Sequence, residues 1–297
     1  MMVKKKTYIL LRLVCILALL VLATGCIKED LSECKEVCTF IVKAFDNSGN
    51  ELSSAEVREV RLFVFDGNYS FIESIDAQVG EPVTINEPGD GDIHVVCWGN
   101  LGSGLQQCTQ PVPGTHKDNC HIDLLPDTRA LSYSTSPGDL FRGEITVASP
   151  DQKGQIILPI YREVGSMTVT VRNLQEFTGY TDEDFSIVVG ETGSTIDFYG
   201  NHTGSKVAYR PTGSFVLNGS RNEYRVAAFN MVPEERDIHI DIYHGTQKIT
   251  TVSLDNSGKP IIVEKGKQTN VLIELRASVS VNVMLTDWGK EYFWKEF

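Results

Sequence analysis

Short apolar, β-branched segments follow one another along most of this chain, at intervals that suit strands. From residue 38 onward they recur about every 10–15 residues, with turn signals rich in Gly, Pro, Asn and Asp between them. Residues 165–172 show the clearest alternation of apolar and polar side chains. No segment carries a three-turn amphipathic helix pattern. The sequence therefore predicts an all-β protein with two tandem antiparallel β-sandwich domains, residues 38–155 and 156–297.

The N-terminus has the features of a bacterial lipoprotein signal. Four basic residues lie within residues 1–12, and an unbroken run of eleven apolar residues fills 13–23. A transmembrane helix needs roughly 20 apolar residues, so this run is typical of a signal peptide. Small residues follow directly before Cys26, whose thiol is the acceptor for a diacylglycerol. We expect residues 1–25 to be removed and Cys26 to hold the mature chain on a membrane through lipid.

The mature chain is strongly acidic. Taking the four basic residues of the signal from 27 Lys+Arg, against 39 Asp+Glu, leaves a formal net charge of −16. Such a surface repels phosphate backbones, which argues against nucleic acid as a partner. Residues 26–37 are polar and acidic without a core pattern, and we interpret them as a tether. Eleven extended residues reach on the order of 35 Å, which lifts a folded domain off the lipid headgroups.

Five further cysteines follow Cys26, all in the first half of the chain: Cys34, Cys38, Cys97, Cys108 and Cys120. An oxidising compartment permits them to form disulfides, but the sequence alone leaves the pairing open. The pairings we favour join the segment of Cys34 and Cys38 to Cys97, and close a loop between Cys108 and Cys120.

Two clusters are candidates for metal chemistry. A zinc site is the rival to the second disulfide, although its spacing matches no standard finger: Cys108, His116, Cys120 and His121. In residues 236–244, Asp237, His239 and Asp241 share one strand face opposite three isoleucines. This row could hold a metal in a metal-dependent hydrolase, but a solvated face opposite a core face is the commoner structure. With no nucleophile elbow or phosphate-binding loop either, we expect no enzyme, no cofactor and no metal.

Several segments, in order along the mature chain, carry a family resemblance. They are Cys26 followed by EDLSEC (29–34), VRLFVFD (60–66), VVCWGNL (95–101), DLFRGEITV (139–147) and YREVGSMTVTVRNL (161–174). The set resembles the anchor subunits of fimbrillin-type fimbriae, lipoproteins that fix a fimbrium base to the outer membrane in Bacteroidetes-type bacteria. The resemblance implies two transthyretin-like β-sandwich domains. It also implies a lipid-bound, surface-exposed subunit that ends the fimbrial polymer and limits its length.

The partners implied by the resemblance are fimbrial shaft subunits, which pair with exposed sheet edges by β-augmentation. Our candidate contact is the C-terminal stretch from Ser278 to Phe297, where five aromatic residues gather in the last ten positions: Trp288, Tyr292, Phe293, Trp294 and Phe297. The alternative is a final strand docked in its own domain, with these aromatics as a plug.

The main alternative function is a surface glycan-binding lipoprotein. Lipidated β-sandwiches with exposed aromatic residues also bind glycans. The positions of Trp98, Trp288 and Trp294 discriminate between glycan binding and fimbrial anchoring. A flat exposed aromatic platform favours a glycan, whereas tryptophans packed beside an open sheet edge favour subunit docking.

Overall fold

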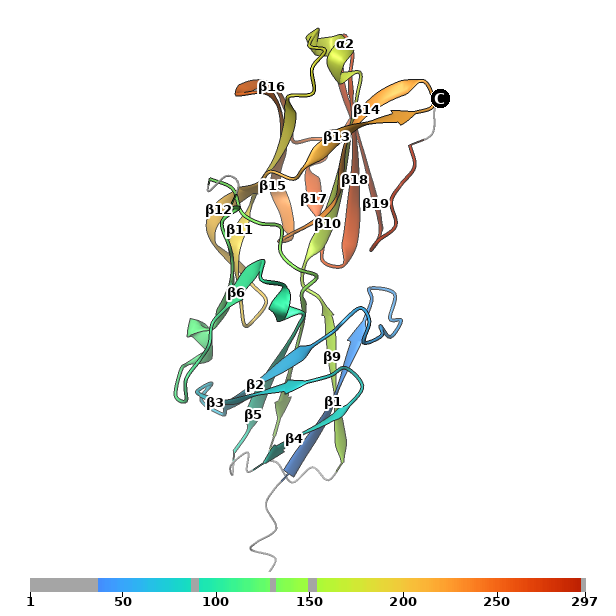
Figure 1. Ribbon diagram of the computed structural model, residues 1–297. Helices are drawn as coiled ribbons and strands as arrows, with labels where there is room; N and C mark the ends of the chain where they lie inside the picture. The colour runs from blue at the N-terminus through green and yellow to red at the C-terminus, as the bar shows by residue number, and fades with distance from the viewer. Residues whose placement is uncertain (1–36, 87–90, 129–131, 149–153, 295–297) are drawn as a thin grey trace, which may run out of the picture. The chain divides into compact units, whose positions relative to one another are not determined.

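The computed structural model describes residues 37–86, 91–128, 132–148 and 154–294. Strands dominate these ranges (Figure 1), which confirms the all-β fold class. Their helical segments are short: α2 (Leu174–Thr178), η2 (Leu101–Ser103) and η3 (Lys117–Asn119), the last two being 3-10 turns. Helix α2 ends at Gly179, whose φ of 76° is a left-handed conformation that glycine adopts readily. Within the described ranges, no helix is both long and apolar enough to cross a membrane.

The first sheet has seven strands in the order β3-β2-β5-β8-β9-β1-β4. In chain order they are β1 (Val37–Phe45), β2 (Val60–Asp66), β3 (Phe71–Ala77), β4 (Pro82–Asn86), β5 (Ile93–Gly99), β8 (Phe141–Val147) and β9 (Gln155–Arg162). A cluster of buried apolar side chains from six of these strands packs together, including Phe40, Leu62, Val95 and Leu158. This cluster is the core of the first half of the chain.

Strand β2 is buried on both of its faces. Leu62 and Val64 belong to the core of the first half, whereas Phe63 and Phe65 belong to a second cluster that includes most of the later strands. An interior strand covered on both sides needs apolar residues throughout. The sequence VRLFVFD therefore shows no apolar–polar alternation.

Two further sheets contain the remaining strands. One has the order β13-β14-β10-β18-β19, and the other has the order β16-β15-β11-β7-β6, with β12 beside β11 and β17 beside β15. The strands of the first are β10 (Gly165–Arg172), β13 (Gly213–Asn218), β14 (Arg221–Met231), β18 (Lys267–Leu275) and β19 (Val279–Asp287). Those of the second are β6 (Gln106–Cys108), β7 (His121–Leu124), β11 (Phe185–Asp197), β12 (His202–Tyr209), β15 (Glu234–His244), β16 (Gln247–Val252) and β17 (Ile261–Val263).

The second cluster of buried apolar residues draws on both of these sheets. The three isoleucines of β15, at 238, 240 and 242, are fully buried in it, as their alternation in the sequence predicts. Val169 and Val171 of β10 and Val271 of β18 join them from the other sheet. The two sheets therefore pack face to face around one core.

The first sheet and the sheet of β10 and β18 each contain one parallel strand pair among the described residues. Strand β1 runs parallel to β9 from Thr39↔Gln155 to Phe45↔Tyr161, and β10 runs parallel to β18 in the same way. Each of these first strands also has one antiparallel neighbour, β4 or β14. The expected purely antiparallel sandwiches are thus mixed, because strands far apart in sequence can return in the same direction. The repeated pairing pattern is consistent with a tandem organisation.

Strand β11 pairs with partners from both halves of the chain. Its residues 185–190 pair with β15, and its last residues, 195–197, pair with β7. Strands β6 and β7 come from residues 106–124, and they extend a sheet made mostly of later strands. Strand β9, from Gln155 to Arg162, belongs to the first sheet. A division into separately folding domains between residues 155 and 156 stays a prediction.

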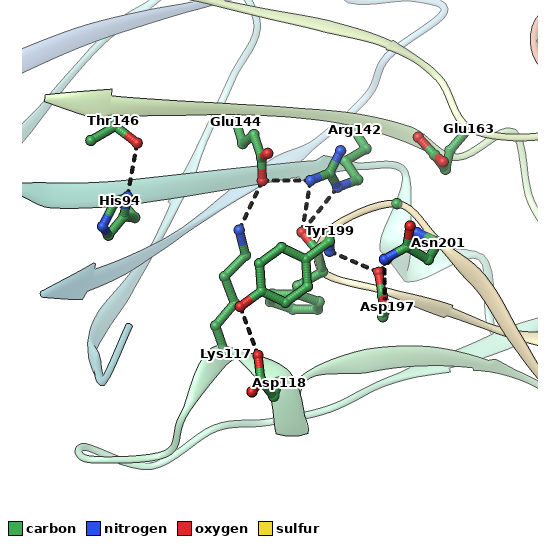
Figure 2. Close-up of polar contacts among 12 residues, drawn as sticks. His94, Lys117, Asp118, Arg142, Glu144, Thr146, Glu163, Asp197, Tyr199 and Asn201 are labelled. Carbon is green, nitrogen blue, oxygen red and sulfur yellow. Dashed lines mark hydrogen bonds and ion pairs between the residues drawn. The ribbon is translucent and has the colours of Figure 1, made fainter. Parts of the chain in front are cut away.

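Polar contacts join the segment before β7 to the first sheet (Figure 2). The Lys117 side chain is 4% exposed, and its Nζ lies 2.8 Å from Glu144 Oε2 on β8. The same Nζ lies 4.0 Å from the ring centroid of Tyr199, in the turn between β11 and β12. Arg142, also on β8, donates a hydrogen bond of 2.8 Å to the carbonyl of Phe198 in that turn. These contacts connect three segments that are distant in sequence.

Candidate functional site

The C-terminal tail, residues 288–294, follows the edge strand β19. Strand β19 pairs with β18 on one side, and no described strand pairs with its other side. Beyond β19 the chain reverses and runs back along the sheet (Figure 1). Because the tail lies beside an open sheet edge, its contacts decide whether it can serve a partner.

Trp288 begins the tail and packs on the first half of the chain. The guanidinium Cζ of Arg162 lies 4.6 Å from the Trp288 ring and 4.8 Å from the ring of Phe141. Arg162 Nε also donates to Asp139 Oδ1 at 2.9 Å, which fixes the orientation of the guanidinium. Burial dominates at Asp139 and raises the pKa of its carboxyl, although Arg162 opposes the shift. Arg162 therefore joins the start of the tail to the end of β9.

The later part of the tail lies against polar side chains of β10 and β18. The backbone N–H of Tyr292 donates to Asn270 Oδ1 at 3.2 Å, and Arg172 Nη2 donates to the carbonyl of Trp294 at 3.2 Å. Asn270 and Arg172 are almost fully buried. They lie on the sheet face opposite the apolar core, because their neighbours Val271 and Val171 point into that core. Hydrogen bonds between the backbone of the tail and these two side chains therefore hold the tail on this outer face.

A buried ion network lies beneath the end of the tail. Arg172 Nε donates to Glu223 Oε1 at 2.7 Å, and Glu223 is fully buried. Burial alone raises the pKa of the Glu223 carboxyl, but hydrogen bonds from Arg172, Arg225 and Asn218 outweigh it and lower that pKa. Glu223 is therefore charged at neutral pH, and it keeps the Arg172 side chain in position to hold the Trp294 carbonyl.

The aromatic side chains of the tail differ in exposure. Phe293 is 76% exposed and Tyr292 is 38% exposed, whereas Trp288 and Trp294 are half-buried. The rings of Tyr292 and Trp294 contact each other edge to face, with centroids 4.8 Å apart. Phe297 lies outside the described residues. The structure thus shows a tail docked on its own chain that still presents apolar surface to solvent.

The structure describes some of the cysteines but not the predicted lipid-attachment site. Cys26 and Cys34 lie outside the described residues. The four described cysteines are free, so neither favoured disulfide appears among them: Cys38, Cys97, Cys108 and Cys120. Cys38 and Cys97 are fully buried and pack as small apolar residues of the first core.

Strand register accounts for the missing bridge between Cys108 and Cys120. Cys108 is paired with Ile122, so Cys120 is its diagonal neighbour. Diagonal neighbours lie about 7–8 Å apart, beyond the usual Cα separation in a disulfide. Burial raises the pKa of Cys108 to about 12 and that of Cys120 to about 11. Both thiols are therefore protonated and unreactive at neutral pH.

The candidate metal row on β15 is occupied by a lysine. Lys248 Nζ lies 2.6 Å from Asp241 Oδ2, and Thr251 donates to the other carboxylate oxygen of Asp241. His239 Nε2 is 3.8 Å from Asp241, and nothing is described for the side chain of Asp237. In the described part of the chain no three potential ligands gather for a metal ion, which includes the candidate zinc residues near Cys108.

Comparison with known protein families shows which family this chain belongs to. The family model of fimbrillin-A associated anchor proteins Mfa1 and Mfa2 matches residues 35–292. The chain belongs to this family. The match confirms the resemblance seen in the ordered sequence segments.

Individual members of the anchor-protein family are similar over nearly the whole chain. The major fimbrium anchoring subunit FimB of Porphyromonas gingivalis is 29% identical over 282 residues, covering 89% of this chain and 90% of FimB. FimB of strain W83 of that species is 29% identical over 286 residues, with the same coverage. The solved structure of the fimbrial anchor protein Mfa2 from Porphyromonas gingivalis has a TM-score of 0.59 at 14% identity, covering 86% of this chain and 98% of Mfa2. At that identity the structural likeness supports the fold.

Sequence reasoning found the aromatic tail of this anchor-family chain but missed the residues beneath it. Arg162, Arg172 and Asn270 hold the tail, and none was singled out. The sequence carried no signal for them. Residues 165–172 alternate cleanly, as in a strand with one solvated face, whereas in the structure every residue of β10 is buried. The tail supplies part of the cover.

Proposed function

We propose that this chain is a lipoprotein that anchors the base of a fimbrium in the outer membrane and limits fimbrial length. Cys26 carries the lipid, residues 26–37 are the tether, and residues 288–297 contact the neighbouring shaft subunit by strand pairing. The observation that carries the proposal is the family match over residues 35–292, together with relatives named as fimbrium anchoring subunits. The role requires binding and no reaction, cofactor or metal.

The geometry of the tail supports a contact of this kind. A partner strand would meet the open side of β19 beyond Val281, whose N–H and carbonyl are bonded to Asn256; Met284 and Leu285 there are 38% and 36% exposed. The tail beside it is held by few hydrogen bonds and exposes Phe293. An unpaired edge with apolar side chains is the surface that β-augmentation uses.

The tryptophans do not favour the glycan-binding alternative. Trp98 is fully buried, and Trp288 has Arg162 against its ring. Trp294 is half-buried beside Tyr292. A sugar ring stacks on a flat exposed aromatic face, whereas Trp98 is fully buried and Trp288 and Trp294 are half-buried. Trp288 and Trp294 instead belong to a tail that follows the edge strand β19 and lies on the outer face of its sheet, which favours subunit docking over glycan binding.

Replacing the lipid acceptor tests the proposal. In cells that make fimbriae, Cys26→Ala prevents acylation while leaving residues 37–294 unchanged, so we expect the chain and the fimbriae to appear in the culture medium. Cys108→Ala is the matched control, because it removes a thiol from a position that carries no lipid. Fimbriae and chain are quantified in medium and membrane fractions. A Cys26→Ala chain that stays with the membranes, or fimbriae that remain on the cells, contradicts the proposal.

A further inference from the structure

The hairpin of β13 and β14 turns directly after the single Asn-Gly step of the sequence, Asn218-Gly219. Asn218 and Arg221 form the last pair of the ladder, so Gly219 is the first central residue of a two-residue turn. Its φ of 61° is the conformation that a type II′ turn requires at this position, and glycine adopts it without steric cost. The fold of the hairpin therefore requires a glycine directly after Asn218.

The backbone nitrogen of Gly219 is open to attack on the side chain before it. Gly219 is exposed, a Cβ at its position would meet nothing within 4 Å, and its N–H has no backbone partner among the described residues. After losing its proton to solvent, such a nitrogen attacks the carboxamide carbon, Cγ, of the preceding asparagine. The N–Cγ bond that forms closes a succinimide ring, the Cγ–Nδ2 bond breaks, and Nδ2 leaves as ammonia. Water then opens the ring to aspartate or isoaspartate.

Asn218 belongs to the buried ion network beneath the C-terminal tail. Its Nδ2 donates to both carboxylate oxygens of Glu223, at 3.2 Å to each. Oε1 of Glu223 also accepts from Arg172 Nε at 2.7 Å. Arg172 in turn donates to the carbonyl of Trp294. The amide that deamidation removes is therefore a direct partner of the carboxylate that positions Arg172.

We propose that Asn218 is a modification site, where spontaneous deamidation replaces a donor of this network by a carboxylate and releases the C-terminal tail. The product faces Glu223 across the 3.2 Å that a hydrogen bond now spans. Two carboxylates so close do not both stay charged in place, so one takes up a proton or Glu223 moves. Either change frees Arg172 from its fixed position under Trp294. Isoaspartate also lengthens the backbone at the end of β13 and breaks its pairing with Arg221.

Ageing of the purified full chain tests the reaction. The protein is kept in mildly alkaline buffer, and peptide mapping by mass spectrometry follows each asparagine. Asn68 and Asn201 are internal controls, because both are exposed but are followed by a tyrosine and a histidine. We expect Asn218 to deamidate about tenfold faster than either control, since glycine does not hinder the attack. Equal rates at the three positions, or no aspartate and isoaspartate at residue 218, overturn the proposal.

A fixed charge at the site tests the consequence for the tail. Asn218→Asp carries the carboxylate of the product, and Asn222→Asp places the same charge on the opposite face of the hairpin, where Asn222 is exposed. Trypsin cleavage after Lys290 in the folded protein measures how often the tail opens. We expect cleavage about tenfold faster in Asn218→Asp and an unchanged rate in Asn222→Asp. Equal rates in the two variants overturn the link between Asn218 and the tail.

Asn218→Ala separates the new charge from the lost hydrogen bonds. It removes both bonds to Glu223 without adding a carboxylate, so we expect cleavage after Lys290 to rise only about threefold. This variant cannot form a succinimide, and ageing should leave its cleavage rate constant. The rate of the unaltered chain should instead climb as residue 218 is converted. If the unaltered chain keeps its initial rate after conversion, deamidation does not release the tail.

Discussion

The guanidinium of Arg162 lies over the indole of Trp288, 4.6 Å from its ring centroid. Arg162 ends β9 in the first sheet, whereas Trp288 begins the tail that follows β19. The contact thus connects the first sheet to the last described residues. It also gives the tail a fixed starting point, from which residues 289–294 run along the outer face of β10 and β18.

Weakening this contact should loosen the tail. Trp288→Leu keeps an apolar side chain and removes the aromatic face, a loss of about 1 kcal/mol of cation–π attraction. We expect trypsin to cleave the folded protein after exposed Lys290 about fivefold faster, since an opened tail is the cleaved form. Leu217→Ala, on an exposed position of β13, is the control and should leave the rate unchanged. An unaltered cleavage rate in Trp288→Leu would show that Arg162 does not hold the tail.

The Glu223 network makes stability depend on pH. The pKa of Glu223 is lowered in the folded protein, so its contribution is fully present above the ordinary glutamate pKa of about 4.3 and is lost as pH falls through the lower folded value. Glu223→Gln leaves the buried Arg172 with Glu274 alone, whose Oε1 lies 3.4 Å from Arg172 Nη1, so the free energy of unfolding should fall by about 3 kcal/mol at pH 7. Urea denaturation from pH 7 to pH 3 should show this difference shrinking, with exposed Glu81→Gln as the control. If Glu223→Gln lowers the free energy of unfolding by the same amount at every pH, Glu223 is not the charged partner of Arg172.

Lys117 and Glu144 should respond unequally to substitution, because only the lysine is buried (Figure 2). Glu144→Gln leaves a buried ammonium without a carboxylate, which should lower the free energy of unfolding by about 3 kcal/mol. Lys117→Met leaves Glu144 half exposed and still paired with Arg142, so the loss should stay below about 1 kcal/mol. Urea denaturation of both variants provides the comparison. If Lys117→Met lowers the free energy of unfolding more than Glu144→Gln does, the buried ammonium of Lys117 is not the group that needs the ion pair.

The described cysteines should be reduced and protected in the folded protein. Burial raises the pKa of Cys97, and that of Cys108 to about 12, so neither thiol forms the reactive thiolate at pH 8. We expect iodoacetamide to modify both only after unfolding, as measured by intact mass and peptide mapping. A peptide pair that joins Cys108 to Cys120 through sulfur would contradict the strand register described above.

Removing residues 288–297 should separate membrane anchoring from fimbrial attachment. The truncation deletes the aromatic tail and spares Cys26, so the shortened chain should remain lipidated in the membrane while fimbriae enter the medium. Fimbriae and the chain itself are measured in the culture medium and in the membrane fraction. Cells that keep their fimbriae after the truncation would show that the tail is not the attachment.

The strand content was predictable from sequence because local alternation reports burial directly. The isoleucines of β15 alternate and are buried as expected. Strand β2 gives no alternation, since Phe63 and Leu62 are buried on opposite faces. The assignment of strands to sheets was less predictable from the sequence. Strands β6 and β7 precede β8 and β9 in sequence, yet β7 pairs with β11 and β6 extends that sheet, and a short hairpin carries no local signal of its distant partner.

The candidate site was predictable only where composition is unusual. Five aromatic residues in the last ten positions identify the tail. The residues that hold it are ordinary in sequence: Asn270 and Arg172 lie in strands whose other face is apolar. Their burial depends on a segment that returns after β19, and side-chain hydrogen bonds to a returning backbone leave no periodic pattern.

The parallel pairing of β1 with β9 determines how the fold resists a pull from its N-terminal side. Tension applied at Val37 along the axis of β1 acts on the whole strand. The ladder from Thr39↔Gln155 to Phe45↔Tyr161 is then loaded in shear, and its hydrogen bonds share the force and must fail together. A strand peeled from its end would release them one at a time. Mechanical strength is thus concentrated at the strand nearest Cys26.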